Sequence, residues 1–83
     1  MNMTGYQNSS CNYLTSDLAL ATALSLRFPV HSINKNNPYK VIFVFQKTKE
    51  LNQFVDLYWK GEIKVNPIEF FNQIKVIKTR IYQ

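Results

Sequence analysis

Few side chains in this sequence have the chemistry of a general base, a nucleophile or a metal ligand. The 83-residue chain contains one histidine, His31, and one cysteine, Cys11. General acid–base and nucleophilic catalysis need a reactive side chain held beside a base that is poised near neutral pH. His31 has no acidic residue near it in the sequence, and Cys11 lies among uncharged polar residues, without the positive charges that activate a thiolate. Neither residue is therefore expected to be catalytic.

Metal-binding and phosphate-binding motifs are also missing from the sequence. One His and one Cys cannot supply the four ligands of a structural zinc site, and two isolated glycines cannot form a phosphate-binding loop. The acidic residues have structural explanations, because they stand at helix starts, on the exposed side of a helix or in solvent. They are Asp17, Glu50, Asp56, Glu62 and Glu69. We therefore predict no catalytic, cofactor-binding or metal-binding residue and no enzymatic activity.

The basic residues suggest binding to nucleic acid as one hypothesis. The formal net charge is +5, and no acidic residue follows Glu69. Helical spacing places Lys75, Lys78, Thr79 and Tyr82 on one face of a C-terminal helix, where basic groups can follow phosphates. The residues predicted for weak, largely sequence-independent binding are Lys75, Lys78, Arg80, Lys60 and Lys64. The alternative is a solvated basic face, which the helix dipole favours near a C-terminus.

The pair Tyr58-Trp59 is the candidate for contact with another protein. Tyr58 follows the apolar stripe of its predicted helix, whereas Trp59 lies at the edge of that stripe. A large ring with one polar atom often anchors a partner at such an edge, although it can also close the base of a small core. Our leading hypothesis is a small non-enzymatic binding or adaptor module that acts through protein–protein contacts, with a protein partner or a second copy in a homodimer.

The first predicted helix is apolar around most of its circumference. It is expected to begin at Thr15 or Ser16, with Asp17 at the positive end of its dipole, and to run to about Arg27. Only Thr22 and Ser25 form a polar strip. A helix of this kind needs cover on more than one side, so it is either central in the fold or meets another molecule.

The remaining elements follow from turn and capping signals. A strand at 30–34, turn residues at 34–38 and the strand YKVIFVFQ at 39–46 predict a β-hairpin. A helix capped by Thr48 should bury Leu51, Phe54, Val55 and Tyr58 and end at Gly61. After a short extended piece at 62–65, Asn66-Pro67 begins a last helix. This helix is expected to bury Ile68, Phe70 or Phe71, Ile74, Val76 or Ile77, and Ile81.

These elements predict one small α+β domain. Its order is helix, strand, strand, helix, short strand, helix, with an antiparallel β-hairpin packed against three helices. The domain should span residues 14–83, because 83 residues leave no room for a second core. Residues 1–13 are polar and uncharged and are interpreted as a tail, in which Tyr6 and Tyr13 can attach part of it to the domain.

Cysteine content and hydropathy indicate the cellular compartment. A lone Cys11 excludes an internal disulfide, which favours a reducing environment. The longest apolar stretch, 18–26, is far shorter than the roughly 20 residues that cross a bilayer. No positive charge precedes it, unlike in a secretory signal. We expect a cytoplasmic protein without a membrane segment, and nothing indicates a small-molecule substrate.

Several strings between residues 13 and 82 form a recognisable pattern: TSDLALATAL, VIFVF, Tyr58-Trp59 ahead of Gly61, VNPIEFF and IKTRIY. Together they resemble a short bacterial and phage family classified as a domain of unknown function. The sequence departs from that family at Arg27-Phe28-Pro29, where a glycine usually follows the first helix. The resemblance implies a fold and a bacterial, phage or mobile-element setting, and it implies no active site.

Overall fold

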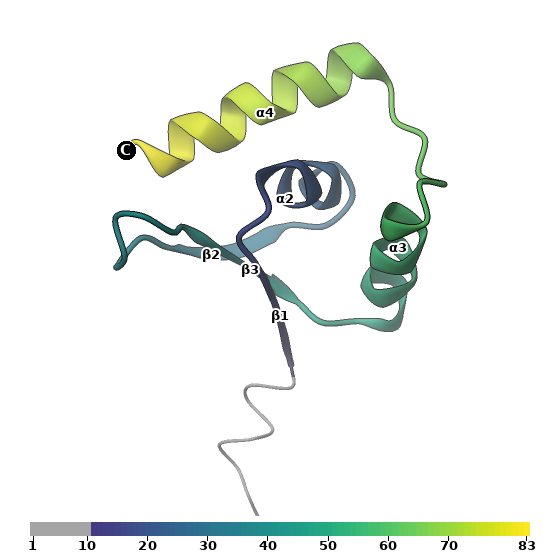
Figure 1. Ribbon diagram of the computed structural model, residues 1–83, viewed down its shortest axis with the longest axis horizontal. Helices are drawn as coiled ribbons and strands as arrows, with labels where there is room; N and C mark the ends of the chain where they lie inside the picture. Colours follow the sequence, from purple (N-terminus) through teal and green to yellow (C-terminus); the bar gives the residue numbers. More distant parts are fainter. Residues whose placement is uncertain (1–10) are drawn as a thin grey trace, which may run out of the picture.

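The polypeptide is arranged in three layers, with a β-sheet, a central helix and an outer helix, and a further helix at one side (Figure 1). The computed structural model describes residues 11–83. Its elements are β1 (Asn12–Thr15), α2 (Leu18–Ser25), β2 (Val30–Asn34), β3 (Ile42–Gln46), α3 (Lys49–Trp59) and α4 (Pro67–Ile81). The predicted class, a small α+β domain with a hairpin and three helices, is confirmed.

The sheet has three antiparallel strands in the order β1-β3-β2. The predicted hairpin is formed by β2 and β3, and Phe43 and Phe45 of the central strand point into the core, where both are buried. Ile33 pairs with Phe43 across the hairpin. The register of β2 shifts between Val30 and Ser32, so its single histidine lies at an irregularity of an edge strand.

Strand β1 corrects the predicted boundary of the tail. Asn12 and Tyr13 were assigned to the tail, but Tyr13 pairs with Phe45 and packs against the core. The amide of Lys47 also donates a hydrogen bond to the carbonyl of Cys11, at 2.7 Å. The strand was not predicted because four residues show little alternation of polar and apolar side chains and because its partner strand is far along the chain. Residues 1–10 of the predicted tail lie outside the described residues.

Helix α2 is covered on several sides, as its composition predicts. Residues 20–24 are all buried, with the sheet on one side, α4 on the other and α3 at the flank (Figure 1). The Thr22 hydroxyl satisfies its hydrogen-bonding capacity locally, because it donates to the carbonyl of Leu18 at 2.8 Å. The predicted start at Thr15 or Ser16 is wrong, since the helix begins at Leu18 and Asp17 caps it, its side chain accepting from the amide of Leu20 at 3.1 Å. The helix ends at Ser25, short of the predicted Arg27.

The termini of α3 and α4 follow the predicted signals. Thr48 caps α3 through the amide of Leu51. At its C-terminus Gly61 has φ 73° and the Glu62 amide bonds to the Leu57 carbonyl, as in a Schellman motif. Asn66 caps α4. The segment 62–65, predicted as a short strand, has no strand partner and instead connects the two helices away from the sheet. Among residues 11–83, no helix is both long and apolar enough to cross a bilayer.

Two neighbouring substitutions in α2 should have different effects on stability. Leu24→Ala removes a completely buried side chain and should lower the free energy of unfolding by about 3 kcal/mol. That is a large share of the roughly 4 to 12 kcal/mol typical for 83 residues. Thr22→Val keeps the shape and should change it by less than about 1 kcal/mol. Urea denaturation measures both. Equal losses of unfolding free energy would contradict the inference that the Thr22 hydroxyl makes only a local hydrogen bond.

Candidate functional site

The inner face of α4 packs on α2 rather than on the sheet (Figure 1). Ile77 is completely buried there, and Phe70 and Ile81 pack against the core as well. A polar contact fixes the rotation of the helix, because the Gln73 side-chain amide donates to the Ser25 hydroxyl at 3.0 Å. The opposite face of α4 is therefore turned to solvent.

This outer face of α4 is partly apolar at its N-terminal end. Ile68 is 72% exposed and Phe71 is 59% exposed. The prediction that Ile68 is a core residue is therefore wrong, and of the two candidate phenylalanines only Phe70 packs inward. Ile68 precedes Ile77 by about two and a half helical turns, so the two side chains point in opposite directions.

The length and crossing of the helices explain why this end is uncovered. Helix α2 has 8 residues and α4 has 15, so they are about 12 and about 22 Å long. In Figure 1 α2 runs nearly along the viewing direction and α4 lies across it. The central helix therefore covers only the middle of α4, and both ends of α4 project beyond it.

Basic and aromatic residues continue the outer face toward the C-terminus. The side chains that share it are exposed, as the spacing predicts: Lys75, Lys78, Thr79 and Tyr82. The Lys75 ammonium lies 4.5 Å from the centre of the Phe71 ring, in the geometry of a cation–π contact. The only acidic residue of α4, Glu69, is in its first turn. The outer face of α4 is thus apolar and basic, without a carboxylate in its C-terminal half.

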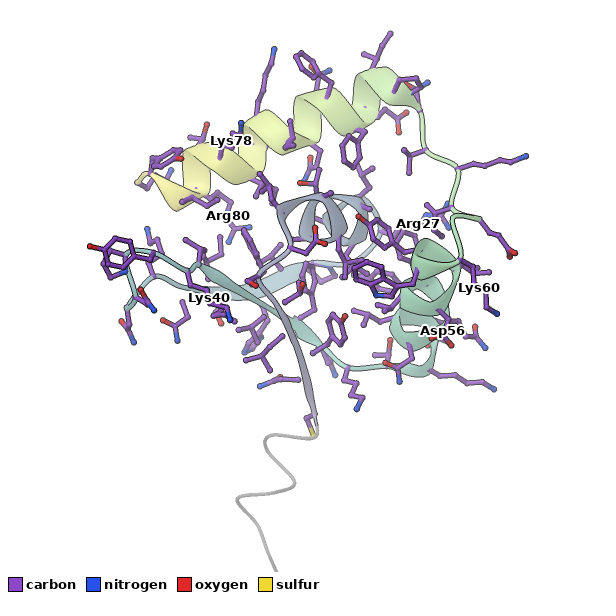
Figure 2. The ribbon with its side chains drawn as sticks, viewed as in Figure 1. Arg27, Lys40, Asp56, Lys60, Lys78 and Arg80 are labelled. Atoms are coloured by element: carbon purple, nitrogen blue, oxygen red, sulfur yellow. The ribbon has the colours of Figure 1, made fainter. Side chains whose placement is uncertain are left out.

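The structure separates the five basic residues that were predicted to act together. Lys78 and Arg80 lie near the β2–β3 connection, whereas Lys60 lies beside α3 on the opposite side of the molecule (Figure 2). Lys64 is in the segment before α4, so the length of that helix, about 22 Å, separates it from Arg80. Lys60 and Lys64 therefore do not extend the surface of Lys75, Lys78 and Arg80.

Sequence reasoning missed the basic residues that do accompany the end of α4. The Lys35 ammonium donates to the carbonyl of Gln83 at 3.0 Å and to that of Arg80 at 3.4 Å, and Lys40 lies on the same side of the molecule (Figure 2). Both lysines come from the β2–β3 connection. Because both lysines lie far from α4 along the chain, the sequence did not indicate that they are close to it in space.

The aromatic pair of α3 is arranged edge to face. The rings of Tyr58 and Trp59 are 5.0 Å apart with an interplanar angle of 88°. Tyr58 is half-buried, while Trp59 is 63% exposed, so the indole does not close the core. Burial, and secondly the negative charge of Asp17, raises the pKa of Tyr58. The same two causes raise the pKa of Tyr13.

The remaining candidates among the described residues form neither a metal-binding site nor an enclosed pocket. His31 is exposed on β2, and residues 11–83 contain no group of three or more His, Cys, Asp or Glu side chains placed to hold a metal ion. A shallow, open depression of about 310 Å³ lies on the solvent side of α3, between Gln53, Asp56, Leu57 and Lys60. Because one face of a single helix supplies all of its lining, it does not enclose a ligand.

Replacement of Asp17 should change the titration of both half-buried tyrosines. Asn caps helices as well as Asp, so Asp17→Asn removes the charge while α2 persists. The pKa values of Tyr13 and Tyr58, raised above 10.0, should fall, because an anion no longer opposes their ionisation. NMR-monitored pH titration measures this change, and unchanged values would contradict the electrostatic contact.

The same shifts predict how stability depends on alkaline pH. The folded protein keeps these two protons above pH 10.0, where unfolded tyrosines ionise, so unfolding releases protons there. Stability should therefore fall as pH rises through the raised pKa values. The fall should be smaller in Asp17→Asn than in the parent protein.

Comparison with known proteins gives a family and no activity. No curated protein and no solved structure shows significant similarity to the chain. A family model described as Domain of unknown function (DUF5659) matches residues 10–83. The match includes every described strand and helix and agrees with the resemblance noted from the sequence strings. The chain therefore belongs to the DUF5659 family.

Proposed function

We propose that the domain is a non-enzymatic binding module that acts through protein contacts, with the apolar end of the outer face of α4 as its docking surface. The observation that carries this proposal is the exposure of Ile68 and Phe71 on a helix whose inner face is already packed. A domain of this size needs most of its large apolar side chains for its own core. Two of them left in solvent on one helix face support a role in binding.

The charge of this surface defines the chemistry of the partner. Lys75 covers the Phe71 ring. A complementary protein surface would offer an apolar groove for Ile68 and Phe71, bordered by Asp or Glu side chains that face Lys75. We therefore propose an acidic groove on another protein as the occupant.

A second copy of this chain fits the surface poorly. Two α4 helices packed antiparallel along their whole outer faces would set the apolar end of each helix against the basic end of the other, so Ile68 and Phe71 would meet cations rather than an apolar surface. The apolar α2 offers no alternative contact, because its residues 20–24 are buried within the domain. Both observations favour a different protein over a homodimer.

Trp59 supports a second, smaller contact. It lies on α3 rather than on α4, and most of its ring is in solvent. Its edge-to-face contact with Tyr58 restricts the ring without covering it, and a restricted aromatic ring loses little freedom on binding. An adaptor that joins two proteins needs two such surfaces.

The proposed setting is the cytoplasm of a bacterial cell, with a phage as one source of the gene. The resemblance to a bacterial and phage family supports the source. The lone Cys11, which is exposed, is suited to a reducing compartment because no internal disulfide is required. A direct check is fractionation of the producing cells. Recovery of the protein from the periplasm or the membrane fraction would contradict this location.

Negative charge introduced at the apolar end should weaken binding of the partner. Ile68→Glu with Phe71→Glu should weaken the partner's binding at least about 30-fold, because hot-spot residues lose about 2 kcal/mol or more. The full chain is used to capture a partner from nuclease-treated lysate of its own cells, and titration of the purified partner measures the affinity.

The control for this experiment is Leu57→Glu, which places one negative charge at an exposed apolar site of α3. The control should bind like the parent protein, and both variants should keep the parent's circular dichroism spectrum. Equal loss of binding in variant and control, or a captured partner without an acidic apolar groove, would contradict the proposal.

Trp59→Ala tests the second contact. Since the ring is largely in solvent, the substitution should change the free energy of unfolding by less than about 1 kcal/mol. It should nevertheless reduce the recovery of a second partner, namely a captured protein that still binds the variant Ile68→Glu with Phe71→Glu. If every captured protein is retained by Trp59→Ala, the indole is not a binding residue.

A further inference from the structure

We infer that a second surface, at the opposite end of α4, binds single-stranded nucleic acid. This surface, the hairpin–α4 end, combines the β2–β3 connection with the C-terminal turns of α4. Its residues are Lys35, Tyr39, Lys40, Lys78, Arg80 and Tyr82. Figure 2 shows Lys40, Lys78 and Arg80 at this end of the molecule. The inference does not depend on the protein contact proposed above.

The bridge from Lys35 assembles the hairpin–α4 end. Its ammonium donates to the carbonyls of Gln83 and Arg80, which joins the β2–β3 connection to the last turn of the helix. A cation at this position also offsets the negative end of the helix dipole. The dipole would otherwise repel a phosphate that approaches this end.

Asparagine side chains order the β2–β3 connection and present Tyr39. The Asn34 side chain accepts a hydrogen bond from the amide of Asn36 at 2.9 Å, and the Asn37 side chain accepts one from the amide of Tyr39 at 2.8 Å. The backbone is thus held in turns while the Tyr39 side chain remains 95% exposed. An ordered backbone reduces the entropy lost when a ligand binds.

The charged side chains at this end have one sign. Lys35, Lys40, Lys78 and Arg80 contribute four positive charges, whereas residues 30–41 and 70–83 contain no acidic residue. The five acidic residues of the chain lie elsewhere, at Asp17, Glu50, Asp56, Glu62 and Glu69. An extended anion with several charges therefore meets attraction without a competing side-chain carboxylate from these segments.

The side chains between these charges favour unpaired bases over an acidic protein. The large exposed rings at this end are tyrosines, with Tyr82 82% exposed and Tyr39 almost completely so, whereas the exposed Ile68 is at the other end of α4. Bases of single strands stack on aromatic rings while lysines and arginines follow the phosphates. In a duplex the bases are already stacked, so the tyrosines would contribute little.

The test is fluorescence anisotropy of a labelled oligothymidine of about 15 nucleotides with the full chain. If about three phosphates are neutralised, the affinity should fall about 20-fold between about 50 and 200 mM salt. Tyr39→Ala should weaken binding about tenfold through loss of stacking, and Lys40→Glu should weaken it and reduce the salt dependence. Both residues are exposed, so the variants should keep the parent's melting temperature.

Lys64→Glu is the matched control, because it makes the same change of charge beyond the other end of α4 and should leave the affinity nearly unchanged. The variant Ile68→Glu with Phe71→Glu should lower the affinity for oligothymidine only by the small amount that two added negative charges explain. This result would separate the hairpin–α4 end from the protein contact. Three results would overturn the inference: equal effects of Lys40→Glu and Lys64→Glu, equal affinity for duplex DNA, or competition by polyglutamate as effective as that by unlabelled oligothymidine.

Discussion

The need to cover α2 on nearly every side determines the rest of this structure. Five consecutive residues of that short helix are buried, and no polar stripe is available to face water. The sheet can cover only one side of it. The chain therefore places α4 on the opposite side and α3 at the flank (Figure 1). An apolar helix that suggested association between molecules is thus covered within one domain.

The position of α4 in the outer layer leaves one of its faces free for binding. A helix that serves as an outer layer packs by one face only, so its other face is available along its whole length. Because α4 is longer than the helix beneath it, its two ends project on either side of the packed middle. The two ends differ in chemistry, with aliphatic and phenylalanine side chains at one and cations with tyrosine at the other.

Local signals in the sequence predicted much of the fold. Thr48, Gly61 and Asn66 act within a few residues of the helix ends that they define, so their roles can be inferred without a tertiary structure. The hairpin at 30–46 was predicted for the same reason. In contrast, β1 depends on pairing with a strand that lies far along the chain, and its own four residues carry almost no pattern.

The candidate surfaces were less predictable than the fold. Spacing showed that Lys75, Lys78 and Tyr82 share a helix face, but not which face α2 would cover, so Ile68 was assigned to the core. The rotation of α4 depends on contacts such as Gln73 with Ser25, which join residues distant in sequence. The grouping of Lys35 with Arg80 has the same tertiary origin, and so does the separation of Lys60 from that group.

The outermost layer is also the last of the described elements to leave the ribosome. Strands and α2 emerge while residues 67–81 are still unsynthesised, so one flank of the central helix faces water in the nascent chain. Closure of the domain must therefore wait for α4, which emerges after every other described element. Any chaperone that meets this protein during translation would find that uncovered flank of α2.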